Sequence, residues 1–512
     1  MSGIGGIGGA GRLPLDPAAT TPATPGAGPV AAPAAPTAPS APAAATVARP
    51  RPVAPAAAAG ARAPVDPAVY GPILDEARRA DWRGLGIDPV RYVDDRLDRE
   101  RFLRPLLADP GAKVVLHRDA LKVGEVGSID GSRTRNVTHP DSKDFPGRVY
   151  LSPEDGAYHV VGILGEDWYR QTLHMLATAG VPASKVEVEG AFDPGRVVER
   201  DLGPTLAAHD FDAVTVGTMG ELTKAMERVL RERVRPAHVE KVLRDMAGHL
   251  EKQAAEARPD RRPAWEERRA RLDAVRAQGG TALERLERVK ADPVLRGPLG
   301  ELIRSADEGP PARELPWRWE TRNAQALAHR VVEVDGRKHL LIHIGGAHGD
   351  MAYHAVRHVL AHEPDLRRVN VYGSAGSFTT RIPPDTFILP RGAIRSAESD
   401  RAPVAVRNEA ALDGAIEVAH SNVSTLLREH RAGIARLTGL PADTVDIESY
   451  HVARAAAEAG RPVELRAILR VSDVATSDAL GAHRPDRGTT SDYEARRAGE
   501  ERAVVALGLV NP

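Results

Sequence analysis

Short apolar runs alternate with helix-like segments through much of the first half of this 512-residue chain. Residues 157–165, 185–192 and 211–220 read as buried strands, and residues 166–180 have the spacing of an amphipathic helix closed by glycine. Alternation of this kind predicts α/β units built on a largely parallel sheet. Short helices are predicted ahead of them at 70–82 and 98–108.

The same pattern returns from about residue 321 and persists. Residues 329–346 predict a hairpin whose strands are joined by Asp335-Gly336, a pair typical of tight turns. Further strands are predicted over 367–378, 385–394 and 463–473, with helices over 350–363, 423–439 and 448–460. We expect the compact core here.

Residues 221–306 differ, because they are long, charged and helical, with Glu and Arg at i to i+4 spacings that support exposed helices. Proline or glycine interruptions are expected at 235–237, 258–264, 277–280 and 296–300. The basic cluster at 258–271 offers a nucleic-acid contact, but the acidic residues within it favour a solvated helical arm.

Composition narrows the class of protein. The formal net charge is −1 and cysteine is absent, which excludes disulfides, thiolate metal sites and a polyanion as the main partner. No apolar run is long enough to span a bilayer, and the first residues lack a secretory signal. We therefore expect a cytoplasmic protein without nucleic-acid or membrane partners.

The first 66 residues consist mainly of Ala, Pro, Gly and Thr. Their apolar groups are too small to offset chain entropy by burial, so a disordered Ala/Pro-rich tail is predicted. A leader for non-classical secretion is the alternative to a plain linker.

Three places in the second half carry chemistry. Residues 373–376 read Gly-Ser-Ala-Gly at a strand end, where small residues allow a ligand to approach the backbone, although glycines also mark ordinary turns. Glu448 begins a helix, where a carboxylate either favours the helix dipole or accepts two neighbouring hydroxyls. Ser472-Asp473 ends an apolar strand, where Asp473 either caps a turn or acts as a proton donor.

In this order the pieces resemble the nucleoside phosphorylase and nucleosidase superfamily, which includes purine nucleoside and uridine phosphorylases, methylthioadenosine/S-adenosylhomocysteine nucleosidases and AMP nucleosidases. The matching pieces are IHIGGAHGDMAYHA, VYGSAGSF, IPPDTFILPRGAI, VDIES and RVSDVA, over about 325–480. The resemblance implies an α/β, three-layer nucleoside phosphorylase-like fold with a central mixed sheet, a small-molecule nucleoside or nucleotide substrate, no cofactor, no metal, and homo-oligomers.

Carried over by residue, the resemblance makes Asp473 the catalytic acid at the purine base and Glu448 the acceptor of the ribose hydroxyls. The remaining substrate-binding residues are Ile447, Ser374, Ala375, Gly376, Ser472 and Gly346. Four segments follow: a disordered tail at 1–66, an α/β N-terminal portion at 67–220, a charged helical arm or insertion at 221–310, and a nucleosidase-like catalytic domain at 311–512.

The chain departs from the phosphorylases at Val371, where they place a phosphate-binding arginine, and the nucleosidases lack that arginine. This favours hydrolysis of a purine nucleoside or nucleotide to free base and sugar. A phosphorylase, and so a glycosyltransferase, would need an arginine such as Arg170, Arg368 or Arg381. A non-catalytic nucleoside-binding or effector module is the other alternative.

The family's first strand is harder to place. Residues 160–171 are the candidate, and they offer Glu166 and Arg170 for a water or phosphate site. Separately, His354, His358 and His362 fall on one helical face, as zinc ligands do, but the sequence shows no third ligand beside them. A half-exposed histidine stripe is therefore the preferred interpretation.

Overall fold

The computed structural model describes residues 62–82, 88–118, 120, 122–126, 129–138, 147–324, 326–343, 349–398, 401–428, 430–440, 442–474 and 490–511. These residues belong to one compact unit, Ala57–Pro512. Most of the predicted tail lies outside the described residues. Its last part is ordered, because β1 (Ala63–Pro64) pairs antiparallel with β6 (Val186–Glu189).

The first sheet has six strands in the order β1-β6-β2-β5-β4-β3. Its other strands are β2 (Val114–His117), β3 (Arg135–Asn136), β4 (Arg148–Leu151) and β5 (Tyr158–Val161). Strands β6, β2 and β5 are parallel, as the sequence predicts, whereas β1, β3 and β4 pair antiparallel, with β1 and β3 at the two edges.

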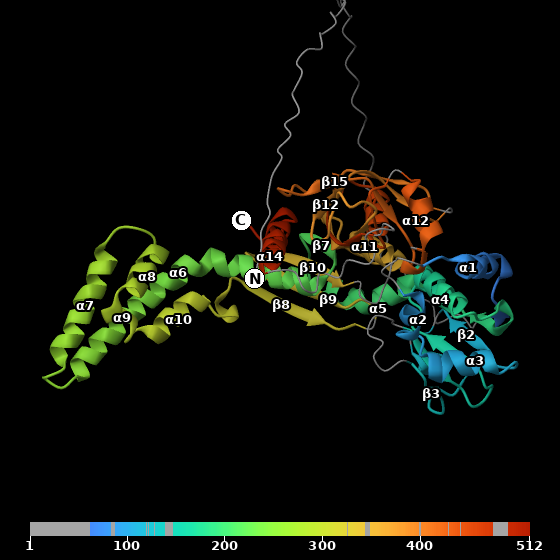
Figure 1. The fold of residues 1–512 in the computed structure, drawn as a ribbon, viewed down its shortest axis with the longest axis horizontal. Coiled ribbons are helices and arrows are strands. Elements are labelled where there is room, and N and C mark those ends of the chain that lie inside the picture. Colours follow the sequence, from blue (N-terminus) through green and yellow to red (C-terminus); the bar gives the residue numbers. More distant parts are fainter. Residues whose placement is uncertain are drawn as a thin grey trace, which may run out of the picture. The chain divides into compact units, whose positions relative to one another are not determined.

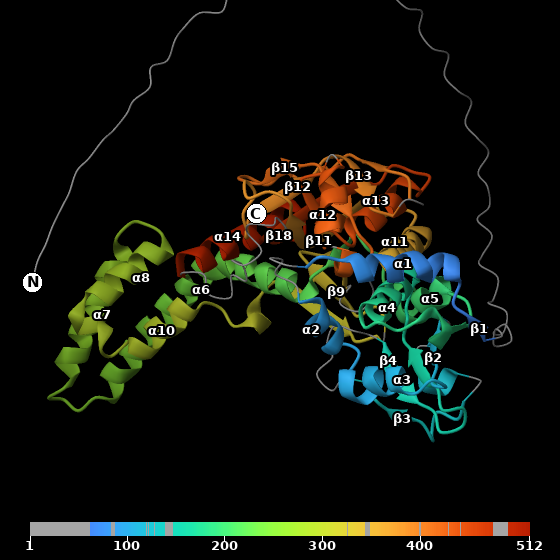
Figure 2. The ribbon, with the colours of Figure 1, turned by 45° about the vertical axis from the view of Figure 1, so that its right-hand side comes forward.

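The helices of this part are α1 (Pro67–Arg79), α2 (Pro89–Asp94), α3 (Arg104–Ala108), α4 (Glu166–Thr178) and α5 (Pro194–Leu206). A π-helical turn at Arg99–Leu103 precedes α3. Helix α4 follows β5 and packs against α1, as Figure 2 shows. Its first turn leads into the candidate site described below.

The second sheet has twelve strands, and its main path runs β14-β13-β16-β17-β11-β7-β10-β9-β8. Strand β18 pairs with β11 and β12, and β15 pairs with β12. The strands are β7 (Ala213–Gly217), β8 (Trp317–Arg322), β9 (His329–Val334), β10 (Arg337–His343), β11 (Arg368–Ser377), β12 (Phe387–Pro390), β13 (Gly392–Ser396), β14 (Val404–Val406), β15 (Ile416–Val418), β16 (His420–Asn422), β17 (Thr444–Asp446) and β18 (Glu464–Val474). Parallel and antiparallel pairs both occur, which confirms the predicted mixed sheet.

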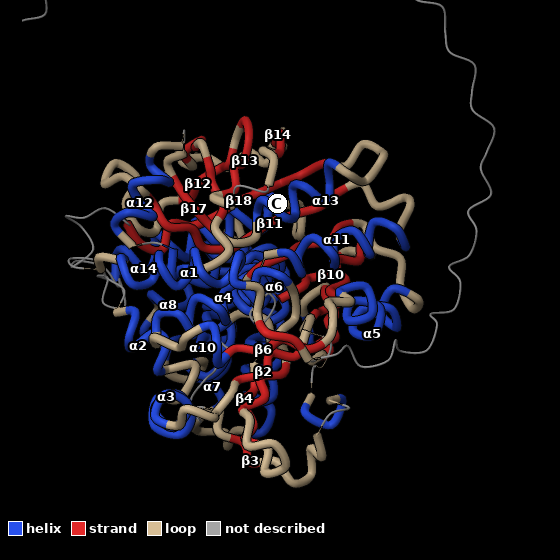
Figure 3. The backbone as a smooth tube through the Cα atoms, turned by 90° about the vertical axis from the view of Figure 1, so that its right-hand side faces the viewer, coloured by secondary structure: helices blue, strands red, loops and turns tan. Residues whose placement is uncertain are grey.

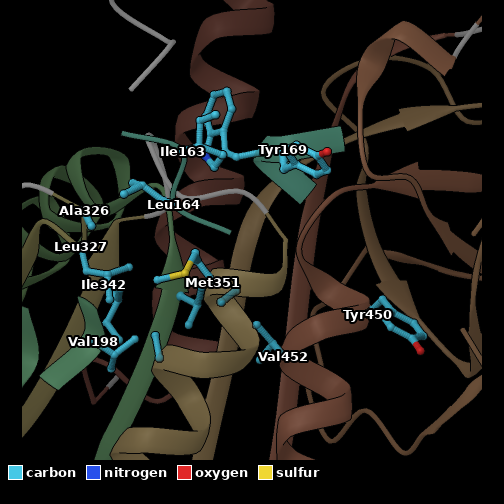
Figure 4. Packing of buried hydrophobic residues seen from close by; sticks show 14 of the residues in the cluster. Ile163, Leu164, Tyr169, Val198, Ala326, Leu327, Ile342, Met351, Tyr450 and Val452 are labelled. Atoms are coloured by element: carbon cyan, nitrogen blue, oxygen red, sulfur yellow. The ribbon is translucent and has the colours of Figure 1, made fainter. Parts of the chain in front are cut away.

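Helices cover both faces of this sheet, so its strands read as nearly continuous apolar runs. Leu340 and Ile342 of β10 belong to one core cluster, which includes α11 (Asp350–His362) and α13 (Ser449–Ala457). Leu341 between them belongs to another, with α6 (Met219–Glu256) and α14 (Thr490–Ala506). This alternation gives three layers, whose strands are red and whose helices are blue in Figure 3. Figure 4 shows part of the first cluster, including Met351 and Val452.

The arm consists of the far half of α6 together with α7 (Arg262–Ala277), α8 (Ala282–Ala291), α9 (Pro293–Arg296) and α10 (Gly300–Glu308). These helices gather along α6 (Figure 1) around their own apolar cluster. The predicted interruption at 235–237 is wrong, because α6 continues through Pro236. Val239, Leu243 and Met246 are buried just beyond it, and this packing offsets the lost hydrogen bond.

The 329–346 prediction is confirmed where described, since β9 and β10 form an antiparallel hairpin. Asp335 and Gly336 have φ of 52° and 77°, as a type I′ turn requires. The single strand predicted over 385–394 is instead β12 and β13, which pair with different strands. The helix predicted over 423–439 is shorter, because only Leu426–Arg428 (3-10) and α12 (Arg431–Thr438) are helical. No described helix is long and apolar enough to cross a membrane.

Candidate active site

Three of the sequence motifs meet at the carboxyl end of β11. Gly376 pairs with Asp473 of β18 on one side and with Val445 of β17 on the other. Neighbouring strands lie about 4.8 Å apart, so these three backbones span about 10 Å. The serine-aspartate, glycine-serine and acidic motifs therefore lie side by side, although about 100 residues separate the first of them from the last along the chain.

A β-bulge shapes this meeting point. The register between β11 and β18 shifts between Ala375 and Gly376, and Ser472 is the residue of β18 that the shift skips. The Ser472 hydroxyl donates to the Ala375 carbonyl oxygen at 3.3 Å. Bulges of this kind bend a strand and increase its local twist. The side chain of Asp473 itself lies outside the described part of the structure.

The other predicted residues of the pocket differ in exposure. Ser374 is exposed, Ala375 is buried in the sheet, and Gly376 is half-buried. Ile447 packs against Phe378, Val423, Leu437 and Val445, so its predicted packing role has an apolar setting. Gly346 lies outside the described residues.

Glu448 stands at the start of α13, directly after β17, but it does not cap that helix. Asp446 does so instead, because its carboxylate accepts from the Ser449 backbone N–H at 3.1 Å and from the Ser449 hydroxyl at 2.8 Å. The helix-dipole role considered for Glu448 is thus filled by a neighbour. The Glu448 carboxyl group instead accepts from the backbone N–H groups of Ile447 and Glu448.

The electrostatic setting of Glu448 is unfavourable to its charged form. Burial, and then the negative charge of Asp446, raise the pKa of Glu448 to about 8, with a smaller contribution from Asp167. At neutral pH the group is therefore mainly protonated. A carboxyl group in this state both donates and accepts hydrogen bonds, as a pair of hydroxyls requires.

Asp167, in the first turn of α4, is the best-connected acid of the site and was missed by the sequence analysis. Its carboxylate, fully buried, accepts from Arg401 at 2.5 Å and contacts His451 Nε2 at 3.0 Å. Burial opposes its ionisation, but His451 and Arg401 hold the pKa of Asp167 well below its usual range. His451 lies one turn after Glu448 on α13, so Asp167 connects α4 of the first sheet to the motif helix.

Two helix starts are tied together at the same place. The Asp350 carboxylate accepts from the backbone N–H groups of Glu166 at 2.7 Å and Asp167 at 3.3 Å, while the Asp350 backbone N–H donates to Asp167 at 3.1 Å. Burial and the Asp167 charge raise the pKa of Asp350 to about 7. Helices α4 and α11 thus each supply a carboxylate to the other's start, an arrangement that favours negative charge.

Gly349 permits this close approach. Its φ is 40°, and a Cβ placed on it would lie 2.1 Å from an Asp167 carboxylate oxygen and 3.0 Å from His451 Nε2. Only glycine fits such a position without displacement. Asp350 and Gly349 belong to the motif IHIGGAHGDMAYHA, which would have been the sequence signal for them.

The predicted pair Glu166 and Arg170 lies near this cluster, but both side chains already have ionic partners. Arg170 contacts Glu398 at 3.2 Å and Glu166 at 3.5 Å, and Glu166 also contacts Arg118 at 3.4 Å. The segment offered as the family's first strand, β5, lies in the first sheet. Strand β7, between β10 and β11, occupies the centre of the sheet that carries the motifs.

A cavity of about 490 Å³ opens next to this acid cluster. Glu398 is buried in its wall and accepts from Ser424 at 2.6 Å and from Arg428 at 2.7 Å. The cavity shares Val423 and Leu437 with the apolar cluster around Ile447. Its lining consists of Ser396, Ala397, Glu398, Val423, Arg428, Gly433, Arg436, Leu437 and Leu440.

The arginines considered for a phosphate site are separated by the fold. Arg368 begins β11, six residues before Ser374 and so roughly 20 Å from it, and it pairs with Glu464. Arg368 is therefore at the wrong end of the strand. Arg381 is exposed shortly after β11, where its guanidinium contacts the Thr379 hydroxyl at 3.4 Å.

Comparison with known proteins gives structural neighbours only, since no family model and no curated protein matches the chain. A methylthioadenosine/S-adenosylhomocysteine nucleosidase from Colwellia psychrerythraea, solved with adenine, is 13% identical with a TM-score of 0.28, covering 37% of this chain and 85% of that one. A futalosine hydrolase from Helicobacter pylori is 9% identical with a TM-score of 0.27, covering 37% and 88%.

A methylthioadenosine phosphorylase from an antarctic soil metagenomic library is 11% identical with a TM-score of 0.27, covering 36% of this chain and 74% of that one. All three belong to the nucleoside phosphorylase and nucleosidase superfamily that the sequence motifs resemble. With TM-scores below 0.5, they assign no role to any residue of this chain. The functional argument therefore depends on the site itself.

Proposed function

We propose that this protein hydrolyses the N-glycosidic bond of a purine nucleoside or nucleotide, releasing free base and (phospho)ribose. The observation that carries the proposal is the register of Asp473, Gly376 and Val445 across three adjacent strands. This register supports the proposal, because the backbones of the three motifs are neighbours in one sheet. The family resemblance adds homo-oligomers and a cytoplasmic location to the proposal.

In this mechanism Glu448 holds the two ribose hydroxyls through its mainly protonated carboxyl group. Asp473 protonates the base as the bond to C1′ breaks, so that the leaving group departs neutral. The sugar develops oxocarbenium character and water adds to C1′, losing a proton that restores the protonated Asp473. General acid catalysis of this kind contributes on the order of 10²–10⁴-fold.

Arg401 and His451 hold Asp167, and Asp167 holds the starts of α11 and α13. These are positioning roles, because they fix the helix that begins at Glu448. Phosphorolysis is the second candidate, and Arg381, which follows β11 along the chain, is the arginine proposed to serve it. No contact among the described residues favours it over hydrolysis.

The test is release of free base from adenosine, inosine, guanosine, uridine, methylthioadenosine and AMP, with and without phosphate. Wild type is compared with Asp473→Asn and Glu448→Gln, and Glu458→Gln, at the exposed end of α13, is the control. Phosphate-independent release that both site variants lose and the control keeps supports hydrolysis. Release only with phosphate makes the protein a phosphorylase. A folded wild type that releases no base from these substrates overturns the proposal and favours a binding module.

A further inference from the structure

A cluster of side chains of types that can ligate a metal ion lies between α5 and α11. Glu199 of α5 faces His358 and His362 of α11, and one ligand atom from each lies within 4.8 Å of the other two. The sequence shows the histidine pair but not its third member, which is 159 residues from His358. His354, the remaining residue of the histidine stripe, is not in this cluster.

The contact between Glu199 and His358 is not a hydrogen bond. Nε2 of His358 lies 3.1 Å from Oε2 of Glu199, yet it has no hydrogen-bond partner within the described part of the chain. Two potential ligand atoms this close to each other, without a hydrogen bond between them, can both contact one shared ion. His358 has 17% of its side chain exposed and Glu199 has 53%, so an ion can reach them from solvent.

His362 is held in the matching tautomer. Its Nδ1 lies 3.0 Å from the backbone carbonyl oxygen of His358, and a carbonyl only accepts, so Nδ1 carries the proton. Nε2 then carries the free lone pair. A histidine that donates its other N–H to a carbonyl is the usual arrangement at metal sites, because that bond orients the ring.

We propose that Glu199, His358 and His362 form a binding site for a divalent transition-metal ion of the zinc class, which ties α5 to α11. Two imidazoles and one carboxylate, with water in the fourth position, are a donor set that zinc accepts. At metal–ligand distances of about 2.0–2.2 Å the donors must draw together by side-chain rotation. Both histidines lie on adjacent turns of α11, and Oε2 of Glu199 is already 3.1 Å from Nε2 of His358, so only small rotations are needed.

Binding of an ion here would affect the candidate active site, because of where α5 and α11 lie in the fold. Helix α5 precedes β7, the central strand, and α11 begins with Asp350 at the candidate active site. His358 is eight residues, or roughly 12 Å, from Asp350 along the helix axis. The ion would therefore fix the far end of the helix whose start contacts Asp167. This inference does not depend on the proposed reaction.

The test uses the untagged full chain, stripped with a chelator and titrated calorimetrically with ZnCl₂, with MgCl₂ as the comparison. Metal content after dialysis is measured by mass spectrometry. We expect one equivalent of zinc to bind wild type, and His358→Ala and Glu199→Gln to weaken binding at least about tenfold. His354→Ala, a control on the same helix face, should bind zinc as wild type does.

Thermal unfolding distinguishes the loss of zinc binding from misfolding of a variant. Zinc should raise the midpoint for wild type and for His354→Ala, but not for folded Glu199→Gln. The proposal is overturned if wild type binds no zinc. It is also overturned if Glu199→Gln and His358→Ala bind one equivalent as tightly as wild type, because the ion would then lie at other residues.

Discussion

Replacing Glu448 by Gln should remove activity and yet stabilise the protein at alkaline pH. The folded-state pKa of Glu448 is about 8, against an ordinary value of 4.5. Between these values the folded state keeps a proton that the unfolded chain has released, so the free energy of unfolding falls as pH rises and levels off above pH 8. Gln carries no charge at any pH, so the variant does not lose this free energy of unfolding as pH rises.

The size of the effect follows from the same two values. At about 1.4 kcal/mol per pH unit, their difference sets an upper limit near 5 kcal/mol at pH 9. Glu448 is half-buried, and relaxation of Asp446 lowers the cost of its charge further. We therefore expect Glu448→Gln to raise the free energy of unfolding by about 2 kcal/mol at pH 9. At pH 4.5, wild type and variant should be nearly equal. Urea unfolding at both pH values, followed by tryptophan fluorescence, measures the difference.

Glu458→Gln is the matched control, for which the change in stability at alkaline pH should have the opposite sign. Hydrogen bonds from Tyr353 and Arg454 lower the pKa of Glu458, so its charged form stabilises the fold above its ordinary titration range. That variant should lose a little stability at pH 9 and none at low pH. The reasoning is refuted if Glu448→Gln is no more stable than wild type at pH 9, or if its gain is the same at both pH values.

Three further changes test the geometry around the site. Gly349→Ala should lower stability by about 3 kcal/mol or more in thermal unfolding, since its Cβ would lie 2.1 Å from Asp167. Unchanged stability would contradict this close approach. Asp167→Asn should cost about 3–5 kcal/mol at pH 7 in urea, because it leaves the largely buried Arg401 guanidinium without its charge partner. The pKa of Asp167 is lowered by folding, so this cost should shrink as pH falls below 4, and a pH-independent cost would argue against the ion pair. Gly217→Ala should prevent folding, as judged by soluble yield and circular dichroism, because its Cβ would meet a β11 carbonyl oxygen at 1.6 Å, whereas Gly220→Ala, with open space around it, should not.

The sequence predicted those features that depend on neighbours along the chain. The Asp335-Gly336 hairpin, the alternating strands and helices and the mixed α/β class are local patterns, and the structure confirms them. It did not predict that β7 would leave the first set of strands and join the second sheet. A buried parallel strand carries no mark of its partners, because any apolar strand can fill the position.

The residues of the candidate site also fall into those that local sequence patterns predict and those that they do not. Glu448, Ser472 and Asp473 have positions that follow from their own motifs, and the strand register brings those motifs together. Asp167 could not be found by such reasoning, since its contacts are with residues 183 and more positions away. Its neighbour Glu166 attracted attention, but the structure gives the central position to the next residue.

The contacts of α1 and α4 argue that the site is not built from 311–512 alone. Strand β7 lies between β10 and β11, so the motif sheet is continuous only when residues 213–217 are present. Asp167 of α4 fixes the starts of α11 and α13, and Glu76 of α1 contacts His430 at 2.9 Å beside the cavity wall. Each contact is an ion pair or hydrogen bond between buried or half-buried groups, where an unpaired partner is costly. The first sheet is therefore better regarded as a support that orients the helix starts of the site than as an appended module.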